Sequence, residues 1–155
     1  MKPNVYNFFK FLNQREQRPI SFKAKLIYAP ETLTPQELNV EGDLDLRKTP
    51  ITSLPEGLIV KGNLLLTNTS ITSLPKGLTV EGSLGLSNTP ITSLPDGLIV
   101  KGDLYLTNTP ITSLPEGLKV EGSLYLMSTP LDEQTKREIR AMVRPNGYIK
   151  GKIYR

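Results

Sequence analysis

A repeat of 20 residues dominates the sequence and limits the folds that it can adopt. Aligned on their valine, the copies begin at Val40, Val60, Val80, Val100 and Val120. Each reads V-x-G-x-L-x-L-x-x-T, and the first four continue with proline or serine and then I-T-S-L-P-x-G-L. A period of this length, kept without insertion, is typical of a solenoid in which each copy forms one coil.

The apolar residues within one copy alternate as they do in a strand with one buried face. In the second copy this set is Val60, Gly62, Leu64 and Leu66, and the residues between them point outward. A single coil cannot bury such a face. Stacking gives every leucine a neighbour above and below, which is worth roughly 1.5–3 kcal/mol for each fully buried side chain. We therefore predict a parallel β-sheet along the stack.

The register of the repeat continues for one period before the first clear copy. Residues 20–39 keep an apolar alternation, and Pro30 and Pro35 fall in register with prolines of the later copies. We therefore expect about six coils over residues 20–130, with a degenerate coil at 20–39 and regular coils at 40–130.

Residues 1–19 are predicted to form an N-terminal helical cap. Asn4 is placed as its N-cap, and four apolar side chains share one helical face. These are Val5, Phe8, Phe9 and Leu12. A helix this apolar would cover the open end of the first coil. A helix that binds a partner or a membrane surface is the alternative.

Residues 131–155 are predicted to form a C-terminal helical cap and a basic tail. We read Thr129-Pro130-Leu131-Asp132 as a capping box with proline at the first helical position. The inner face would then hold Leu131, Thr135, Ile139, Met142 and Val143. In the tail, Ile149 and Ile153 alternate with charged residues, which is the pattern of a strand added to the solenoid or paired with another chain.

The repeat resembles a leucine-rich repeat, whose signature is L-x-x-L-x-L-x-x-N-x-L, with cysteine as the alternative to asparagine. Leu64-x-Leu66-x-x-Thr69-x-Ile71 fits the second half, with threonine in place of the asparagine. The 20-residue length and the following Leu-Pro resemble the short LPX-type class of secreted bacterial effectors. The variant G-x-L-x-L-x-x-T-x-I-T-S-L-P-x-G-L is also similar to repeat proteins of bacteria and their phages. The resemblance implies an α/β leucine-rich-repeat solenoid that binds proteins through a concave sheet.

The composition removes the commonest catalytic groups. The chain has no cysteine and no histidine, which excludes thiol nucleophiles, imidazole bases and the commonest metal ligands. Effectors with ubiquitin-ligase activity and similar repeats need a separate catalytic domain with a cysteine nucleophile, as the resemblance implies. We therefore predict that the protein is not an enzyme and uses no cofactor.

The sequence also lacks the signals of membrane insertion and secretion. No apolar run approaches the roughly 20 residues needed to span a bilayer, and the N-terminus has no signal-peptide pattern. We expect a cytoplasmic protein without a membrane partner, in the host cytoplasm if the chain is encoded by a phage.

One outward column of the predicted sheet alternates in charge. It consists of Glu41, Lys61, Glu81, Lys101 and Glu121. At the strand spacing of about 4.8 Å, this alternation predicts a ladder of cross-strand ion pairs. Asp43 and Asp45 join Glu41 in an acidic cluster with the oxygen ligands that calcium prefers. The neighbouring cations neutralise this cluster more simply, so we predict no metal site.

Another outward column changes its residue type along the stack, although each of its residues occupies the same strand position in its own coil. It consists of Asp45, Leu65, Gly85, Tyr105 and Tyr125. Met127 lies beside the tyrosines, and aromatic residues and methionine are enriched in interface cores. We therefore predict a partner-binding surface around Tyr105, Tyr125 and Met127, extended by Leu65 and Arg47. The alternative is that the C-terminal segment folds over both tyrosines.

A secondary basic surface is predicted on the C-terminal helix. Its cations are Lys136, Arg137, Arg140 and Arg144. Residues 131–155 carry seven cations and three anions, whereas residues 40–130 carry six and nine. A solvated face is the simplest interpretation; an acidic protein partner and, less in keeping with the rest of the chain, nucleic acid are the alternatives.

A uniform scaffold with variable outward columns indicates a presentation surface. We interpret the chain as a non-enzymatic module that binds a partner protein, in its sharper version a phage or bacterial inhibitor or effector acting on a host protein. A self-associating structural or assembly component is the alternative, so a homo-oligomer is a possible partner.

Overall fold

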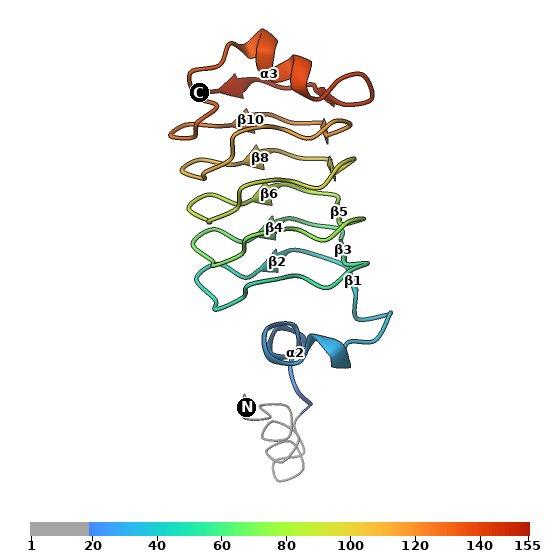
Figure 1. Ribbon diagram of the computed structural model, residues 1–155. Coiled ribbons are helices and arrows are strands. Elements are labelled where there is room, and N and C mark those ends of the chain that lie inside the picture. Colours follow the sequence, from blue (N-terminus) through green and yellow to red (C-terminus); the bar gives the residue numbers. More distant parts are fainter. Residues whose placement is uncertain (1–18) are drawn as a thin grey trace.

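The computed structural model describes residues 19–155, which form a parallel β-solenoid. Figure 1 shows the coils stacked in a nearly straight column. Helix α2 (Phe22–Tyr28) lies at the N-terminal end of this column and helix α3 (Lys136–Met142) at the other end. Within residues 19–155, no helix combines the length and the hydropathy that crossing a membrane requires.

Each coil contributes two short strands, and these form two six-stranded parallel sheets. The first sheet contains β1 (Asn39–Val40), β3 (Ile59–Val60), β5 (Thr79–Val80), β7 (Ile99–Val100), β9 (Lys119–Val120) and β11 (Tyr148–Ile149). The second sheet contains β2 (Leu44–Asp45), β4 (Leu64–Leu65), β6 (Leu84–Gly85), β8 (Leu104–Tyr105), β10 (Leu124–Tyr125) and β12 (Ile153–Tyr154).

The prediction of one continuous strand in each copy is wrong, although the predicted inward residues are largely correct. Val60, Leu64 and Leu66 are fully buried, but the chain bends at residues 61–62 and divides into β3 and β4. The bend needs glycine because consecutive coils almost touch there. A Cβ atom on Gly102 would lie 2.7 Å from the backbone nitrogen of Ser83 and 2.8 Å from the carbonyl carbon of Gly82.

The threonine that replaces the asparagine of the leucine-rich-repeat signature closes the next turn. Thr69 is buried, and its Oγ1 donates a 2.7 Å hydrogen bond to the carbonyl oxygen of Leu66. The equivalent threonines of the other copies make the same bond: Thr49, Thr89, Thr109 and Thr129. The residue before this threonine has a left-handed backbone, with φ of 59° at Asn68, a conformation that asparagine tolerates well.

The predicted degenerate coil at residues 20–39 is wrong. This segment forms α2 and a 3₁₀ turn, Pro30–Thr32. Ser21 caps α2 by accepting a hydrogen bond from the backbone N–H of Ala24. The helix packs on the first coil through Leu26, which is 2% exposed. The predicted N-terminal helix with Val5, Phe8, Phe9 and Leu12 lies outside the described residues.

The C-terminal helix begins later than predicted. Thr129 is already committed to the turn of its own coil, and Asp132 accepts a hydrogen bond from the backbone N–H of Ser128. The N-cap is Thr135, which forms a capping box with Glu138. Among the predicted inner-face residues, Leu131, Ile139 and Val143 are buried, Met142 is partly buried and the N-cap is exposed.

The tail after α3 adds a strand to each sheet. Strand β11 pairs with β9, and β12 pairs with β10, both in parallel. The backbone N–H of Gly151 donates to the carbonyl oxygen of Gly122 at 2.9 Å, as the equivalent glycines do between regular coils. Of the two interpretations of the tail, the structure therefore shows the added strand.

Candidate functional site: an aromatic ladder

Three tyrosines form a stacked ladder on the outer face of the second sheet. Tyr105 and Tyr125 project from β8 and β10, and Tyr154 joins them from β12. The ring centroids of each neighbouring pair are 4.6 Å apart, with interplanar angles of 14° and 11°. The parallel register places the three residues directly opposite one another, and its strand spacing of about 4.8 Å suits ring stacking.

The C-terminal segment extends this ladder and leaves its edge open to solvent. Tyr105 and Tyr125 are partly buried, and Tyr154 is 39% exposed. Because stacked rings cover one another's faces, the surface they present consists of ring edges and phenol groups. The alternative in which the tail buries both predicted tyrosines does not describe this structure.

A carboxylate orients the first ring of the ladder. The hydroxyl of Tyr105 donates a 3.2 Å hydrogen bond to Oδ2 of Asp103. Partial burial raises the pKa of Tyr105, and the bond to Asp103 raises it further. Desolvation, followed by the negative charge of Asp103, likewise raises the pKa of Tyr125. Both phenols are therefore neutral hydrogen-bonding groups near pH 7.

The other predicted site residues differ in how close they lie to the ladder. Met127 follows β10 and is 37% exposed. Leu65 is separated from Tyr105 by the Gly85 level of the stack, and its Cδ2 lies 3.5 Å from the position that a Cβ of Gly85 would occupy. Arg47 stands two levels beyond Gly85 along the sheet, so the structure does not bring it to the tyrosines.

Arg47 is occupied within its own coil. Its Nε and Nη2 atoms donate hydrogen bonds of 2.9 and 2.7 Å to the carboxylate of Asp45. These bonds, together with one from the backbone N–H of Arg47, lower the pKa of Asp45 to about 2. The predicted acidic cluster is thus divided, because Glu41 pairs with Lys61 and Asp43 accepts a backbone hydrogen bond.

The predicted charge ladder is confirmed and extends into the tail. Salt bridges join Glu41 to Lys61 at 2.8 Å and Glu81 to Lys101 at 3.1 Å. Glu121 pairs with Lys150 of the tail. The column thus holds adjacent coils together in pairs, in keeping with its predicted structural role.

A neighbouring polar column ties each coil to the next. Oδ1 of Asp103 accepts a 2.7 Å hydrogen bond from the backbone N–H of Ser123. The equivalent side chains make the same contact with the following coil: Asp43, Asn63, Ser83 and Ser123. The residue type changes, but an acceptor is present at each of these steps. This column belongs to the scaffold, whereas the tyrosine column has no comparable contact with the backbone.

The four predicted basic residues lie together on α3 and the turn after it. Lys136, Arg137, Arg140 and Arg144 line one hollow, with Ala141 between them. Nη2 of Arg140 donates a 3.0 Å hydrogen bond to the carbonyl oxygen of Gly151, which fixes this side chain against the tail.

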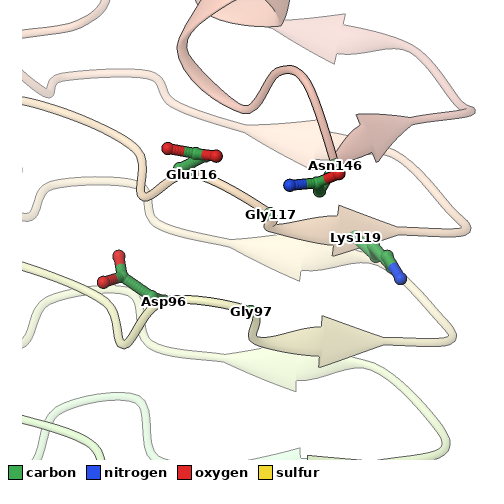
Figure 2. A pocket seen from close by; sticks show the side chains of 6 residues that line it. All are labelled: Asp96, Gly97, Glu116, Gly117, Lys119 and Asn146. Carbon is green, nitrogen blue, oxygen red and sulfur yellow. The ribbon is translucent and has the colours of Figure 1, made fainter.

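A further pocket lies where the turn after α3 meets two coil turns. Figure 2 shows the carboxylates of Asp96 and Glu116 on successive coils, with Asn146 to the right of Glu116 and Lys119 directed away. Within residues 19–155, no group of three or more carboxylate, imidazole or thiol side chains has the arrangement of a metal site. The pocket is lined by two separate acidic side chains, an amide and the amine of Lys119.

Sequence reasoning missed Tyr154, although the sequence carries a signal for it. Ile149-Lys150-Gly151-Lys152-Ile153-Tyr154 matches Val100-Lys101-Gly102-Asp103-Leu104-Tyr105 in its glycine, its apolar positions and its final tyrosine. This match lies 29 residues after the fifth copy instead of 20, because α3 and its flanking turns intervene. A search without a fixed period would have found it if the valine and leucine positions of V-x-G-x-L-x also accepted isoleucine.

Comparisons with protein-family models, curated proteins and solved structures found no match to this chain.

Proposed function

We propose that this protein is a non-enzymatic binding module whose partner protein contacts the outer face of the second sheet. The observation that carries this proposal is the ladder of Tyr105, Tyr125 and Tyr154, with the exposed Met127 beside it. Tyrosine and methionine are enriched at interfaces, where tyrosine combines apolar area with a hydrogen-bonding end.

The contrast between neighbouring columns supports this assignment. Asp103 and its equivalents accept hydrogen bonds from the next coil, so the stacking of the coils requires an acceptor at these positions. The tyrosine column holds aspartate, leucine and glycine at other levels of the same sheet. A binding role accounts for the placement of large aromatic side chains at one end of a column that the scaffold leaves free.

The proposal has a narrower version that rests on the sequence resemblance. The buried Leu64, Leu66 and Ile71 of the G-x-L-x-L-x-x-T-x-I motif support a leucine-rich repeat of the LPX type. In this version, helical segments close both ends of a stack of about six coils. The similarity to repeat proteins of bacteria and their phages supports an inhibitor or effector that acts on a host protein in the cytoplasm.

The experiment uses the full chain as bait in a bacterial lysate, followed by titration of the captured protein. Tyr125→Ala removes the middle ring and should weaken binding at least about tenfold, as loss of a buried interface anchor does. Tyr148→Ala is the matched control, because this exposed tyrosine lies on the first sheet, and it should bind like the wild type. Equal binding by all three proteins would contradict the proposal.

Light scattering separates a foreign partner from self-association. The proposal predicts a monomer whose mass Tyr125→Ala leaves unchanged. A wild-type dimer that Tyr125→Ala dissociates would overturn the proposal in favour of a self-associating component.

A further inference from the structure

Four cations of α3 and the turn after it lie together without forming an ion pair within residues 19–155. Five ion pairs lie within residues 19–155, and they use Lys25, Arg47, Lys61, Lys101 and Lys150. None of them uses the four cations that line the α3 hollow, Lys136, Arg137, Arg140 and Arg144. Some coil cations, such as Lys61 and Lys101, are paired with carboxylates of neighbouring coils, whereas α3 and the turn after it gather four cations on one surface.

The one acidic side chain of α3 itself, Glu138, caps the start of the helix. The carboxylate of Glu138 accepts hydrogen bonds from the backbone N–H and the hydroxyl of Thr135, both at 2.7 Å. The bonds from Thr135 lower the pKa of Glu138, so the carboxylate stays ionised in its capping role. The hollow therefore keeps its positive charge.

The fold fixes this basic surface toward solvent. Ile139 and Val143 are buried against the solenoid core, so the opposite face of α3 points away from the stack. Lys136, Arg137 and Arg144 are exposed, and Arg140 is held by its bond to Gly151. Clustered like charges repel one another, and an anionic ligand would remove that repulsion.

We propose that the α3 hollow is a second docking surface, for an acidic segment of a partner protein. Lys136 and Arg140 lie four residues apart on α3, which is about 6 Å along the helix, and Arg144 lies on the turn that follows. Closely spaced carboxylates on an acidic segment match this group of cations in charge. Arginine forks suit carboxylate recognition because they can donate two parallel hydrogen bonds.

Nucleic acid fits this surface less well. The hollow has no aromatic lining residue on which an unpaired base could stack. The helix contains seven residues and is therefore only about 10 Å long, which limits the number of phosphates that it can contact. This inference deepens the proposed function but does not depend on the tyrosine ladder, which lies on the second sheet.

The test measures binding of labelled poly-L-glutamate by fluorescence anisotropy. The wild type should bind it at low salt, and the affinity should fall steeply as NaCl rises from about 0.05 to about 0.5 M. The double variant Lys136→Glu, Arg137→Glu should bind at least about tenfold more weakly. Tyr125→Ala should retain wild-type affinity for this probe, which separates this surface from the aromatic ladder.

A second double variant controls for net charge. Lys23→Glu, Lys76→Glu makes the same charge change at exposed positions on α2 and a coil turn, and its affinity should stay within about twofold of the wild type. Equal losses in both double variants would overturn the proposal, as would absence of binding at low salt. Tighter binding of duplex DNA than of poly-L-glutamate would replace it with a nucleic-acid surface.

Discussion

The two ends of the solenoid show opposite relations between sequence and structure. Residues 20–39 keep the 20-residue register of the repeat, yet they form α2 and a 3₁₀ turn. The tail lies out of that register, yet β11 and β12 continue both sheets. An alternation of apolar residues in the 20-residue register is therefore not sufficient for a segment to form a coil of this solenoid.

A first coil must offer acceptors and left-handed turns to the coil that follows. In the register of the repeat, Lys23 would stand in the acceptor column, but its side chain has only donors. Tyr28 and Glu37 would stand where Lys48 and Gly57 have φ of 58° and 75°. A residue with a Cβ atom adopts such angles only at a cost in backbone strain, which glycine avoids.

A last coil has a different requirement, which is a glycine where its backbone meets the preceding coil. Gly151 meets it, since a Cβ there would collide with the backbone of Gly122. Lys152 stands in the acceptor column of this coil. Its backbone N–H donates to the hydroxyl of Ser123.

The largest predicted effect tests the requirement for glycine where the backbone of one coil meets the preceding coil. Gly102→Ala should lower the free energy of unfolding by about 3 kcal/mol, because the new methyl group would press on backbone atoms of the preceding coil. Gly42→Ala is the control, since its Cβ would meet no atom within 4 Å. Urea denaturation measures both. Equal losses at the two glycines would remove the distinction between the first coil and later coils.

The requirement for a hydrogen-bond acceptor in the column of Asp103 predicts a smaller loss of free energy of unfolding. Asp103→Leu leaves the backbone N–H of Ser123 without its 2.7 Å hydrogen bond and should cost about 1–3 kcal/mol. Asp103→Asn keeps an acceptor, as Asn63 does two levels earlier in the stack, and should stay close to the wild type. Chemical denaturation of the two variants checks this difference, and a neutral leucine variant would refute the requirement.

The charge ladder predicts the smallest effect, which depends on pH. Hydrogen bonds from Lys150 and then Tyr148 lower the pKa of Glu121 below its ordinary 4.5. A lowered folded-state pKa stabilises the fold above the ordinary value, and this stabilisation is lost as the pH falls through the folded-state pKa. Glu121→Gln should therefore lower the Tm slightly at pH 7, and this difference should shrink as the pH falls below 4.5 through the folded-state pKa. A Tm difference that grows on acidification would contradict this sign.

The sequence predicted the features that each copy repeats. The buried columns, the parallel stacking and the alternating ion pairs follow from periodicity, because identical copies must satisfy identical neighbours. The bend at residues 61–62 and the role of Thr69 depend on close backbone approaches and local hydrogen bonds. An apolar pattern does not encode these features.

The ends were harder to predict because their neighbours differ from those of an inner coil. Phe22 and Leu26 fit the apolar alternation of a strand and also the i, i+4 spacing of a helix. Helix α3 begins later than predicted because the hydroxyl of Thr129 donates a hydrogen bond within the turn of its own coil. Within the candidate site, the tyrosine pair was predictable from column chemistry, but Tyr154 required the tail to be aligned outside the fixed period.

The most direct test of the central claim measures partner affinity and thermal stability on the same double variant, Tyr105→Ala, Tyr125→Ala. The account predicts that the affinity for the captured protein falls at least about tenfold. It also predicts that the Tm stays within about 10 °C of the wild type, because these rings lie outside the buried core and the coils lose only ring stacking of about 0.5–1.5 kcal/mol for each pair. Full affinity in the folded double variant would contradict the claim that the aromatic ladder is the binding surface.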